Sequence, residues 1–125
     1  MEASESTSHG HQPIGRKQKL TALIEGAKIV ERVEVVEVSF PAYQQAGRHL
    51  HPCPVVGCVT AGTILFQIEG QPSQLLKPGD VFFEPANAPV RHFDNPAAEP
   101  AAFIAYYLLG SDDHKLITML PTAQD

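Results

Sequence analysis

Short apolar segments separated by turn residues run along most of the chain. From Leu20 onward, segments rich in Val, Ile, Leu and Phe alternate with Gly, Pro, Asn and Asp at intervals of about 8 to 12 residues, which is typical of β-sandwiches and barrels. No segment sustains the apolar period of a helix. The pattern predicts an all-β domain of about ten short strands in a closed or nearly closed antiparallel barrel.

The same pattern places the individual strands. A long strand with a polar face is expected from residue 29 to Phe40, ending at Pro41, with a bulge near residues 35–36. Ala61 and Gly62 are expected to join two strands in a tight hairpin. The remaining strands are expected at residues 55–60, 63–68, 74–76, 81–83, 92–93 and 101–109, with a short strand or helical turn at 115–120.

The beginning of the chain differs in composition from the rest. Residues 1–18 are rich in Ser, Glu, Gln, Gly and His and hold almost no large apolar side chains, so we expect a disordered arm. Residues 19–120 form the single predicted domain, and residues 121–125 a C-terminal tail. His9 and His11 in the arm lack a strand to hold them, so we expect them to be exposed to solvent rather than bound to a metal.

Composition limits the classes of partner. The formal net charge of −5 argues against a nucleic-acid binder, and the one basic cluster, Arg16, Lys17 and Lys19, is expected to be solvated. No apolar stretch approaches the ~18 residues needed to cross a bilayer, and the first residues do not resemble an export signal, so no membrane partner is expected. We expect a cytoplasmic protein in which Cys53 and Cys58 are free thiols.

A pair of histidines two residues apart carries most of the chemical information. On a strand, His49 and His51 would project to the same face, and His92 is the nearest candidate for a third imidazole. Three histidines could simply line a barrel mouth, satisfied by water. We favour one divalent transition metal ion bound by His49, His51 and His92, because close imidazoles in an apolar pocket are costly without a shared cation. Iron, manganese, nickel, zinc and copper all accept such ligands.

These histidines belong to two motifs that resemble those of the cupin superfamily, specifically its small single-domain bacterial members, over about residues 20 to 110. The first cupin motif has a histidine pair and a later glycine, matched by His49, His51 and Gly62. The second has Gly-Asp, a proline, a histidine and an asparagine. It is matched by Gly79, Asp80, Pro85, His92 and Asn95.

The chain departs from the cupin pattern at three places. Val55 stands where the first motif has a metal-binding glutamate. The glycine that opens this motif is displaced, with Tyr43 at the counted position and Gly47 nearer the histidines. The stretch from Pro85 to His92 is two residues longer than usual.

The resemblance implies a jelly-roll (double-stranded β-helix) barrel and a metal-dependent function. Cupins with three histidines and no glutamate include thiol and diketone dioxygenases, so the leading hypothesis is a dioxygenase-like oxidoreductase acting on a small chelating metabolite. A non-catalytic module that binds or senses a small molecule is an alternative, and a metal-dependent isomerase or lyase is another. We also expect a homodimer, because an open jelly roll leaves sheet surface and edges that a second copy could cover.

Several other side chains are candidates for completing the site. Glu84 could be a fourth ligand, although a carboxylate at the surface rim is the favoured interpretation. Cys53 could approach the ion as a thiolate, whereas Cys58 is expected in the core. Either Tyr106 or Tyr107 should face the interior. An apolar lining is expected from Val55, Phe66, Phe83, Phe93 and Phe103 or their neighbours.

Overall fold

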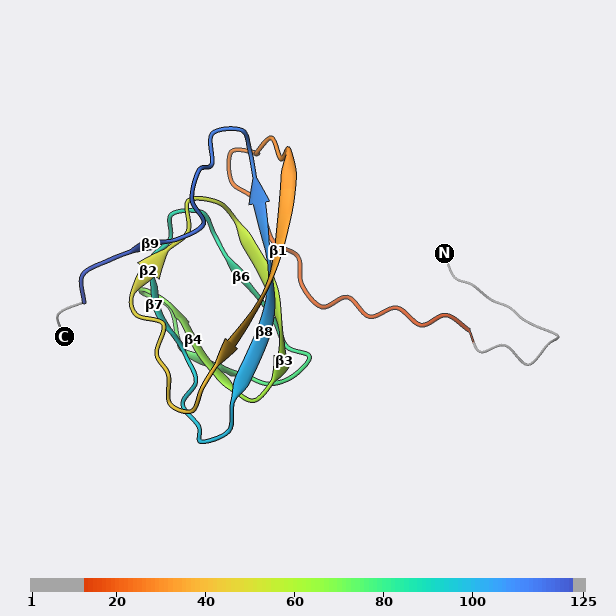
Figure 1. The fold of residues 1–125 in the computed structure, drawn as a ribbon. Helices are drawn as coiled ribbons and strands as arrows, with labels where there is room; N and C mark the ends of the chain where they lie inside the picture. Colours follow the sequence, from red (N-terminus) through yellow and green to blue (C-terminus); the bar gives the residue numbers. More distant parts are fainter. Residues whose placement is uncertain (1–12, 123–125) are drawn as a thin grey trace.

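The computed structural model describes residues 13–122, and in this range the chain forms nine strands and no helix (Figure 1). One sheet has the order β1 (Arg32–Phe40), β8 (Ala101–Leu109), β3 (Val55–Ala61) and β6 (Val81–Glu84). The other has the order β5 (Gln74–Leu76), β4 (Ile64–Ile68), β7 (Val90–Asp94), β2 (His49–Leu50) and β9 (Thr118–Met119). Neighbouring strands in both sheets are antiparallel, so the predicted all-β jelly roll is confirmed.

The predictions for the two ends of the chain fall largely beyond the described range. His9, His11 and the first part of the predicted arm lie outside the described residues, as do the last three residues of the predicted tail. Residues 13–18 are exposed and belong to no strand. Within residues 13–122 no helix could cross a membrane.

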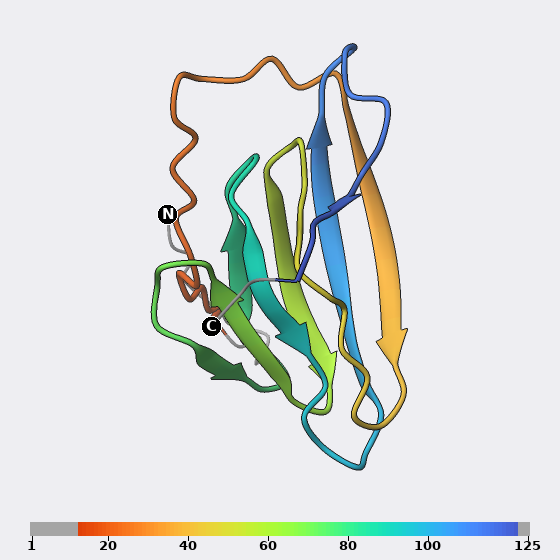
Figure 2. The ribbon, with the colours of Figure 1, turned by 90° about the vertical axis from the view of Figure 1, so that its left-hand side faces the viewer.

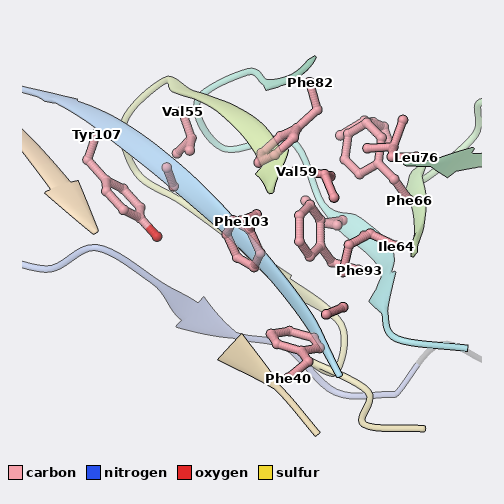
Figure 3. Close-up of a cluster of buried hydrophobic side chains, with 14 of the residues drawn as sticks. Phe40, Val55, Val59, Ile64, Phe66, Leu76, Phe82, Phe93, Phe103 and Tyr107 are labelled. Carbon is pink, nitrogen blue, oxygen red and sulfur yellow. The ribbon is translucent and has the colours of Figure 1, made fainter. Parts of the chain in front are cut away.

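Alternating side chains on each strand create the core between the two sheets. On β8, the odd-numbered residues from Ala101 to Leu109 are buried and the even-numbered residues are not. Five phenylalanine rings meet between the sheets, mostly edge to face, with ring centroids as close as 4.7 Å for Phe93 and Phe103 (Figure 3). The core ring cluster consists of Phe40, Phe66, Phe82, Phe93 and Phe103. Phenylalanine burial on both inner faces therefore holds the sandwich together.

The first strand is more regular than predicted. Its pairing with β8 runs without a break from Arg32–Leu109 to Phe40–Ala101, and the two strands lie side by side along the body (Figure 2). The bulge expected near residues 35–36 is therefore wrong. Val36 packs against the core and Val35 faces outward with 58% exposure, so the two valines are neighbours on opposite faces of an unbroken strand. The register shift occurs instead in β3, between Val59 and Ala61.

The turn at Gly62 joins different sheets, so the predicted hairpin between β3 and β4 is also wrong. β3 pairs with β6 and β8, whereas β4 pairs with β5 and β7. Gly62 has φ +69°, and a Cβ atom there would lie 2.5 Å from the carbonyl oxygen of Pro100. A local turn signal cannot distinguish a hairpin from such a corner, because the difference lies in which distant strand each arm pairs with.

Asn95 ties the end of β7 to neighbouring loops. Its side-chain amide donates to the carbonyl oxygens of Pro41 at 3.0 Å and Glu99 at 2.7 Å, and its Oδ1 accepts from the backbone N–H of Ala97. Only 1% of this residue is exposed, so these bonds satisfy a polar group that has little access to water.

Replacing Gly62 with Ala should destabilise the fold by about 2–4 kcal/mol, since the substitution adds left-handed strain and a steric clash. Gly70→Ala is the matched control, because Gly70 has φ +86° but no other atom within 4 Å of the point that a Cβ would occupy. That variant should lose only about 1–2 kcal/mol. Urea denaturation measures both losses, and equal losses would contradict the close packing at the corner.

Candidate metal centre

A cavity of about 460 Å³ opens between the two sheets. Most of its wall is apolar, and the polar side chains that line it include His49, His51, Glu84 and Tyr107. The apolar lining includes Val38, Phe40, Val55, Phe82, Phe93, Phe103, Ala105 and Ile117. A hollow of this size with few polar groups has the character of a small-molecule site.

The expected lining is confirmed in part. Val55, Phe93 and Phe103 line the cavity. Phe66 is buried in the core without lining the cavity, and Phe83 lies on the outward-facing side of β6, where Phe82 takes the inward position. Adjacent residues on a strand face opposite sides, so a shift of one position in the predicted parity explains this exchange.

His49 and His51 lie together at this cavity and are 4% and 6% exposed. Their ring centroids are 5.0 Å apart. Nδ1 of His49 lies 2.7 Å from the carbonyl oxygen of Gly47, and Nδ1 of His51 lies 2.6 Å from that of Leu116. A carbonyl oxygen can only accept, so each Nδ1 carries the proton and each neutral ring keeps an Nε2 lone pair for a ligand.

Glu84 is the third member of the group. One ligand atom from each of His49, His51 and Glu84 lies within 4.8 Å of the others, and Glu84 is only 2% exposed. The favoured interpretation of Glu84 as a carboxylate at the surface rim is therefore wrong. Glu84 follows Phe82 at an inward position of β6, and this alternation was the signal that could have placed it inside.

The contact between Glu84 and His51 tests whether a cation fits. Glu84 Oε1 lies 2.9 Å from Nε2 of His51, yet it has no hydrogen bond among the described residues. In the neutral ring Nε2 carries no proton, so this approach brings two acceptors together in a buried place. A proton shared by the two atoms, or a cation between them, would relieve the repulsion. The donor set therefore fits a divalent metal ion.

The surroundings of His51 favour the protonated form of its ring. Burial lowers the pKa of the His51 imidazole, but the close contact with Glu84 and its negative charge, with the Leu116 carbonyl, outweigh it, so the net pKa is raised above 6.5. The direction follows because the carboxylate favours the positively charged form of the ring. A metal ion would meet the same electrostatic demand.

His92 lies elsewhere. Its Nδ1 is 2.8 Å from Oδ2 of Asp94, its side chain is 38% exposed, and it lines a separate hollow of about 190 Å³ with Arg48 and Arg91. The structure therefore brings His49 and His51 together but does not bring His92 to them.

An irregularity in the strand just before His92 accounts for its position. Val90, two residues earlier, pairs with His49 and is fully buried. Between Val90 and His92 the pairing with β4 shifts register, with Ile68 opposite Val90 and Gln67 opposite His92. The irregularity leaves an apolar side chain at the interior position and places His92 beside the half-exposed Gln67.

The carboxylate missing at position 55 is present on the neighbouring strand. Val55 and Glu84 are direct partners in the pairing of β3 with β6. Opposite residues in an antiparallel pair have Cβ atoms about 4.5–5.5 Å apart, so a glutamate can reach the same point from either strand. Glu84 thus brings a carboxylate to the cavity from the position opposite Val55.

The remaining candidates, two tyrosines and two cysteines, differ in their burial. Tyr107 lines the cavity with its ring 5.5 Å from that of His51, and Tyr106 faces outward with 41% exposure. Burial, with the charges of Glu84 and Cys53, raises the pKa of Tyr107 to about 12, so its phenol is neutral near pH 7. Cys53 is fully buried and Cys58 half-buried, both thiols are free, and neither joins the ligand group.

Elemental analysis and calorimetric titration of chelator-treated protein should show which side chains hold the metal. Glu84→Gln should weaken divalent metal binding by about 100-fold or more, because losing a ligand costs more than the 10–100-fold typical of an outer-shell partner. His92→Ala should leave the affinity within about twofold of that of the unchanged protein.

The double variant Val55→Glu/Glu84→Val moves the carboxylate to the opposite strand. It should recover at least about tenfold of the affinity lost in Glu84→Val, since the two positions face each other. Equal losses from His92→Ala and Glu84→Gln would instead favour a site that includes the third imidazole.

Stability in alkali should reflect the burial of Cys53. Burial, then the negative charge of Asp113, raises the pKa of the Cys53 thiol from 9.0 to about 11, with Lys28 acting in the opposite direction. The stabilising effect is complete below pH 9 and is lost as the pH rises through about 11, a loss of about 3 kcal/mol. Denaturation at several pH values measures this decrease in the free energy of unfolding. Cys53→Ala should make the decrease smaller, whereas Cys58→Ala should leave it unchanged.

Known proteins resemble this chain in fold. DMSP lyase DddQ from Ruegeria pomeroyi DSS-3 is 24% identical with a TM-score of 0.61, over 70% of this chain and 42% of the lyase. Oxalate oxidase in complex with the substrate analogue glycolate is 20% identical with a TM-score of 0.61, over 70% of this chain and 46% of the oxidase. This chain thus aligns with less than half of either enzyme.

A third similar structure is close to this chain in size. The uncharacterized conserved protein with a double-stranded beta-helix domain from Klebsiella pneumoniae is 18% identical with a TM-score of 0.61, over 81% of this chain and 90% of that one. No curated protein matches the sequence. A family model described as "Cupin domain" matches residues 36–107, more than half of the chain. The chain therefore belongs to the cupin family.

Proposed function

We propose that this cupin binds one divalent transition metal ion through His49, His51 and Glu84 and acts on a small chelating ligand as a dioxygenase-like oxidoreductase. The observation that carries the proposal is the buried, unsatisfied Oε1 of Glu84 beside Nε2 of His51. Two histidines and one carboxylate with open coordination positions are typical of non-haem iron(II) oxygenases, so iron is the metal we favour.

The protein's own groups prepare the site for this chemistry. The carbonyl oxygens of Gly47 and Leu116 hold the two imidazole rings with their Nε2 atoms available. A bound metal ion would supply a Lewis acid and positions for ligand and dioxygen. The neutral phenol of Tyr107 lies at the same cavity and can donate a hydrogen bond to a ligand oxygen or sulfur. The apolar wall limits the access of water.

The charge of the cavity suggests the class of ligand. No Lys or Arg side chain lines it within the described range. A divalent ion together with the Glu84 carboxylate leaves one net positive charge, which matches a neutral ligand or a monoanion. A dianion would leave a buried negative charge uncompensated. Monothiols, β-diketones and phenols therefore suit the site better than dicarboxylates.

Oxygen uptake tests the reaction. Iron-loaded protein, supplied with a panel of thiols, β-diketones and phenols, should consume dioxygen with at least one of them, and Glu84→Gln should lower the rate by about 100-fold or more. Ligand binding without turnover would favour the binding or sensing module. Turnover without oxygen would favour the isomerase or lyase.

Competition experiments test the proposed ligand charge. Calorimetry on metal-loaded protein should show a monoanionic β-diketonate binding at least about tenfold more tightly than a dicarboxylate of similar size. Gln44→Arg, which adds a cation to the cavity lining, should reduce the difference in affinity between the β-diketonate and the dicarboxylate. If the dicarboxylate binds more tightly to the unchanged protein, the charge argument fails while the metal site stands.

We also propose that the protein forms a homodimer and is located in the cytoplasm. The more general expectation, a protein that binds a small molecule, rests on family membership and the cavity. Outward side chains such as Val35 and Tyr106 do not line the cavity, so a second copy could contact them without filling it.

A further inference from the structure

The loop that follows β8 is held to the chain that leads into β1, and the two lie side by side in both ribbon views (Figure 1, Figure 2). Nζ of Lys28 donates to Oδ2 of Asp113 at 2.9 Å. The Arg32 guanidinium donates to the carbonyl oxygens of Gly110 at 3.4 Å and Asp113 at 3.1 Å. Asp113 Oδ2 also accepts from the backbone N–H of Gly110 at 2.7 Å. We call these four residues, Lys28, Arg32, Gly110 and Asp113, the loop anchor.

The ion pair of the loop anchor is shielded from water. The side chains of Lys28 and Asp113 are 22% and 13% exposed, whereas those of Arg32 and Glu34, an ion pair on β1, are 46% and 45% exposed. The Gly110 N–H and the Lys28 ammonium lower the pKa of Asp113. Exposed ion pairs contribute little to stability, but a shielded carboxylate that also accepts a backbone hydrogen bond contributes more. The loop anchor therefore fixes one end of this loop.

The residues that follow the loop anchor reach the candidate metal centre. Shortly after Asp113, the carbonyl oxygen of Leu116 lies 2.6 Å from Nδ1 of His51, and Ile117 lines the cavity. Residues 114–117 belong to no strand. The position of the Leu116 carbonyl therefore depends on the loop anchor before it, on β9 after it, and on the packing of the Leu116 side chain against the core.

Of these supports, β9 is a short one. Its two residues pair with β2 and stand at the edge of the sheet. Such short edge elements open locally at a low free-energy cost. Without the loop anchor, the chain between β8 and β9 would leave its position more often.

We propose that Lys28, Arg32 and Asp113 are positioning residues for His51, because they hold the loop that carries the Leu116 carbonyl. In the neutral His51 ring, the Leu116 carbonyl at Nδ1 and the Glu84 carboxylate at Nε2 compete for one proton. The carbonyl keeps the proton on Nδ1 and leaves the Nε2 lone pair for a cation. If the loop moves away, the proton passes to Nε2, and that atom no longer accepts a metal ion.

The consequence for metal binding rests on the proposed function, whereas the effect on the ring does not. NMR of the metal-free full chain measures the ring through the imidazole nitrogen shifts of His51, at a pH above the pKa of this histidine. Lys28→Met should lower the ratio of the Nδ1–H to the Nε2–H tautomer by about threefold or more. Lys28→Arg keeps the positive charge and should restore the ratio of the unchanged protein.

Calorimetric titration of chelator-treated protein with Zn²⁺ measures the consequence. Lys28→Met and Asp113→Ala should each weaken zinc binding by about threefold to tenfold, less than the roughly 10–100-fold typical of a direct outer-shell partner. Glu34→Ala is the matched control, since Glu34 also binds Arg32 but does not contact the loop. It should leave the affinity within about twofold of that of the unchanged protein.

Urea denaturation checks that each variant folds, and Lys28→Gln replaces Asp113→Ala if that variant unfolds. A tautomer ratio that stays the same in Lys28→Met would overturn the inference, as would equal effects of Glu34→Ala and Lys28→Met. Zinc binding that is present but insensitive to the loop anchor would also overturn it. An unchanged protein that binds no zinc, but whose tautomer ratio responds to Lys28→Met, would overturn the proposed function and support the positioning role.

Discussion

The buried approach of Glu84 Oε1 to Nε2 of His51 is the contact on which the candidate site depends. Two acceptor atoms 2.9 Å apart, in a cavity walled mainly by apolar side chains, repel each other unless a proton or a cation lies between them. The fold holds the two atoms at this distance because the backbone positions each of the two side chains. Glu84 sits at an inward position on β6, and the Leu116 carbonyl oxygen orients the His51 ring. A positive charge at this contact, on a proton or on a bound cation, would therefore stabilise the arrangement.

Sheet pairing explains how a carboxylate can reach the same cavity from either of two strands. The carboxylate of the first motif is absent at Val55, but Val55 and Glu84 face each other across β3 and β6. At the other side of the cavity, the register shift next to Val90 moves His92 out of the interior. Position in the sheet, rather than position in the motif, decides which side chains meet.

Much of the fold could be predicted from local patterns. The strand from Ala101 to Leu109 is marked by an apolar run with two tyrosines. The two-residue spacing of His49 and His51 likewise predicts that they share a face, and both line one cavity. The sheet to which each strand belongs was not accessible in this way. The turn at Gly62 has the composition of a hairpin, and only the packing of Ala101 and Pro100 against it shows that it is a corner. The burial of Glu84 likewise depends on its partner strand, which is far away in the sequence.

His51 connects the cavity to the far end of the chain, because its Nδ1 proton goes to Leu116, a residue that follows the last long strand. His49 likewise pairs with Met119 on β9, whose two residues form the edge of the sheet. An occupant that prefers the oriented imidazoles also prefers the docked C-terminal segment, since the two equilibria are thermodynamically linked. Loading of the cavity and protection of residues 116–119 against local unfolding should rise and fall together.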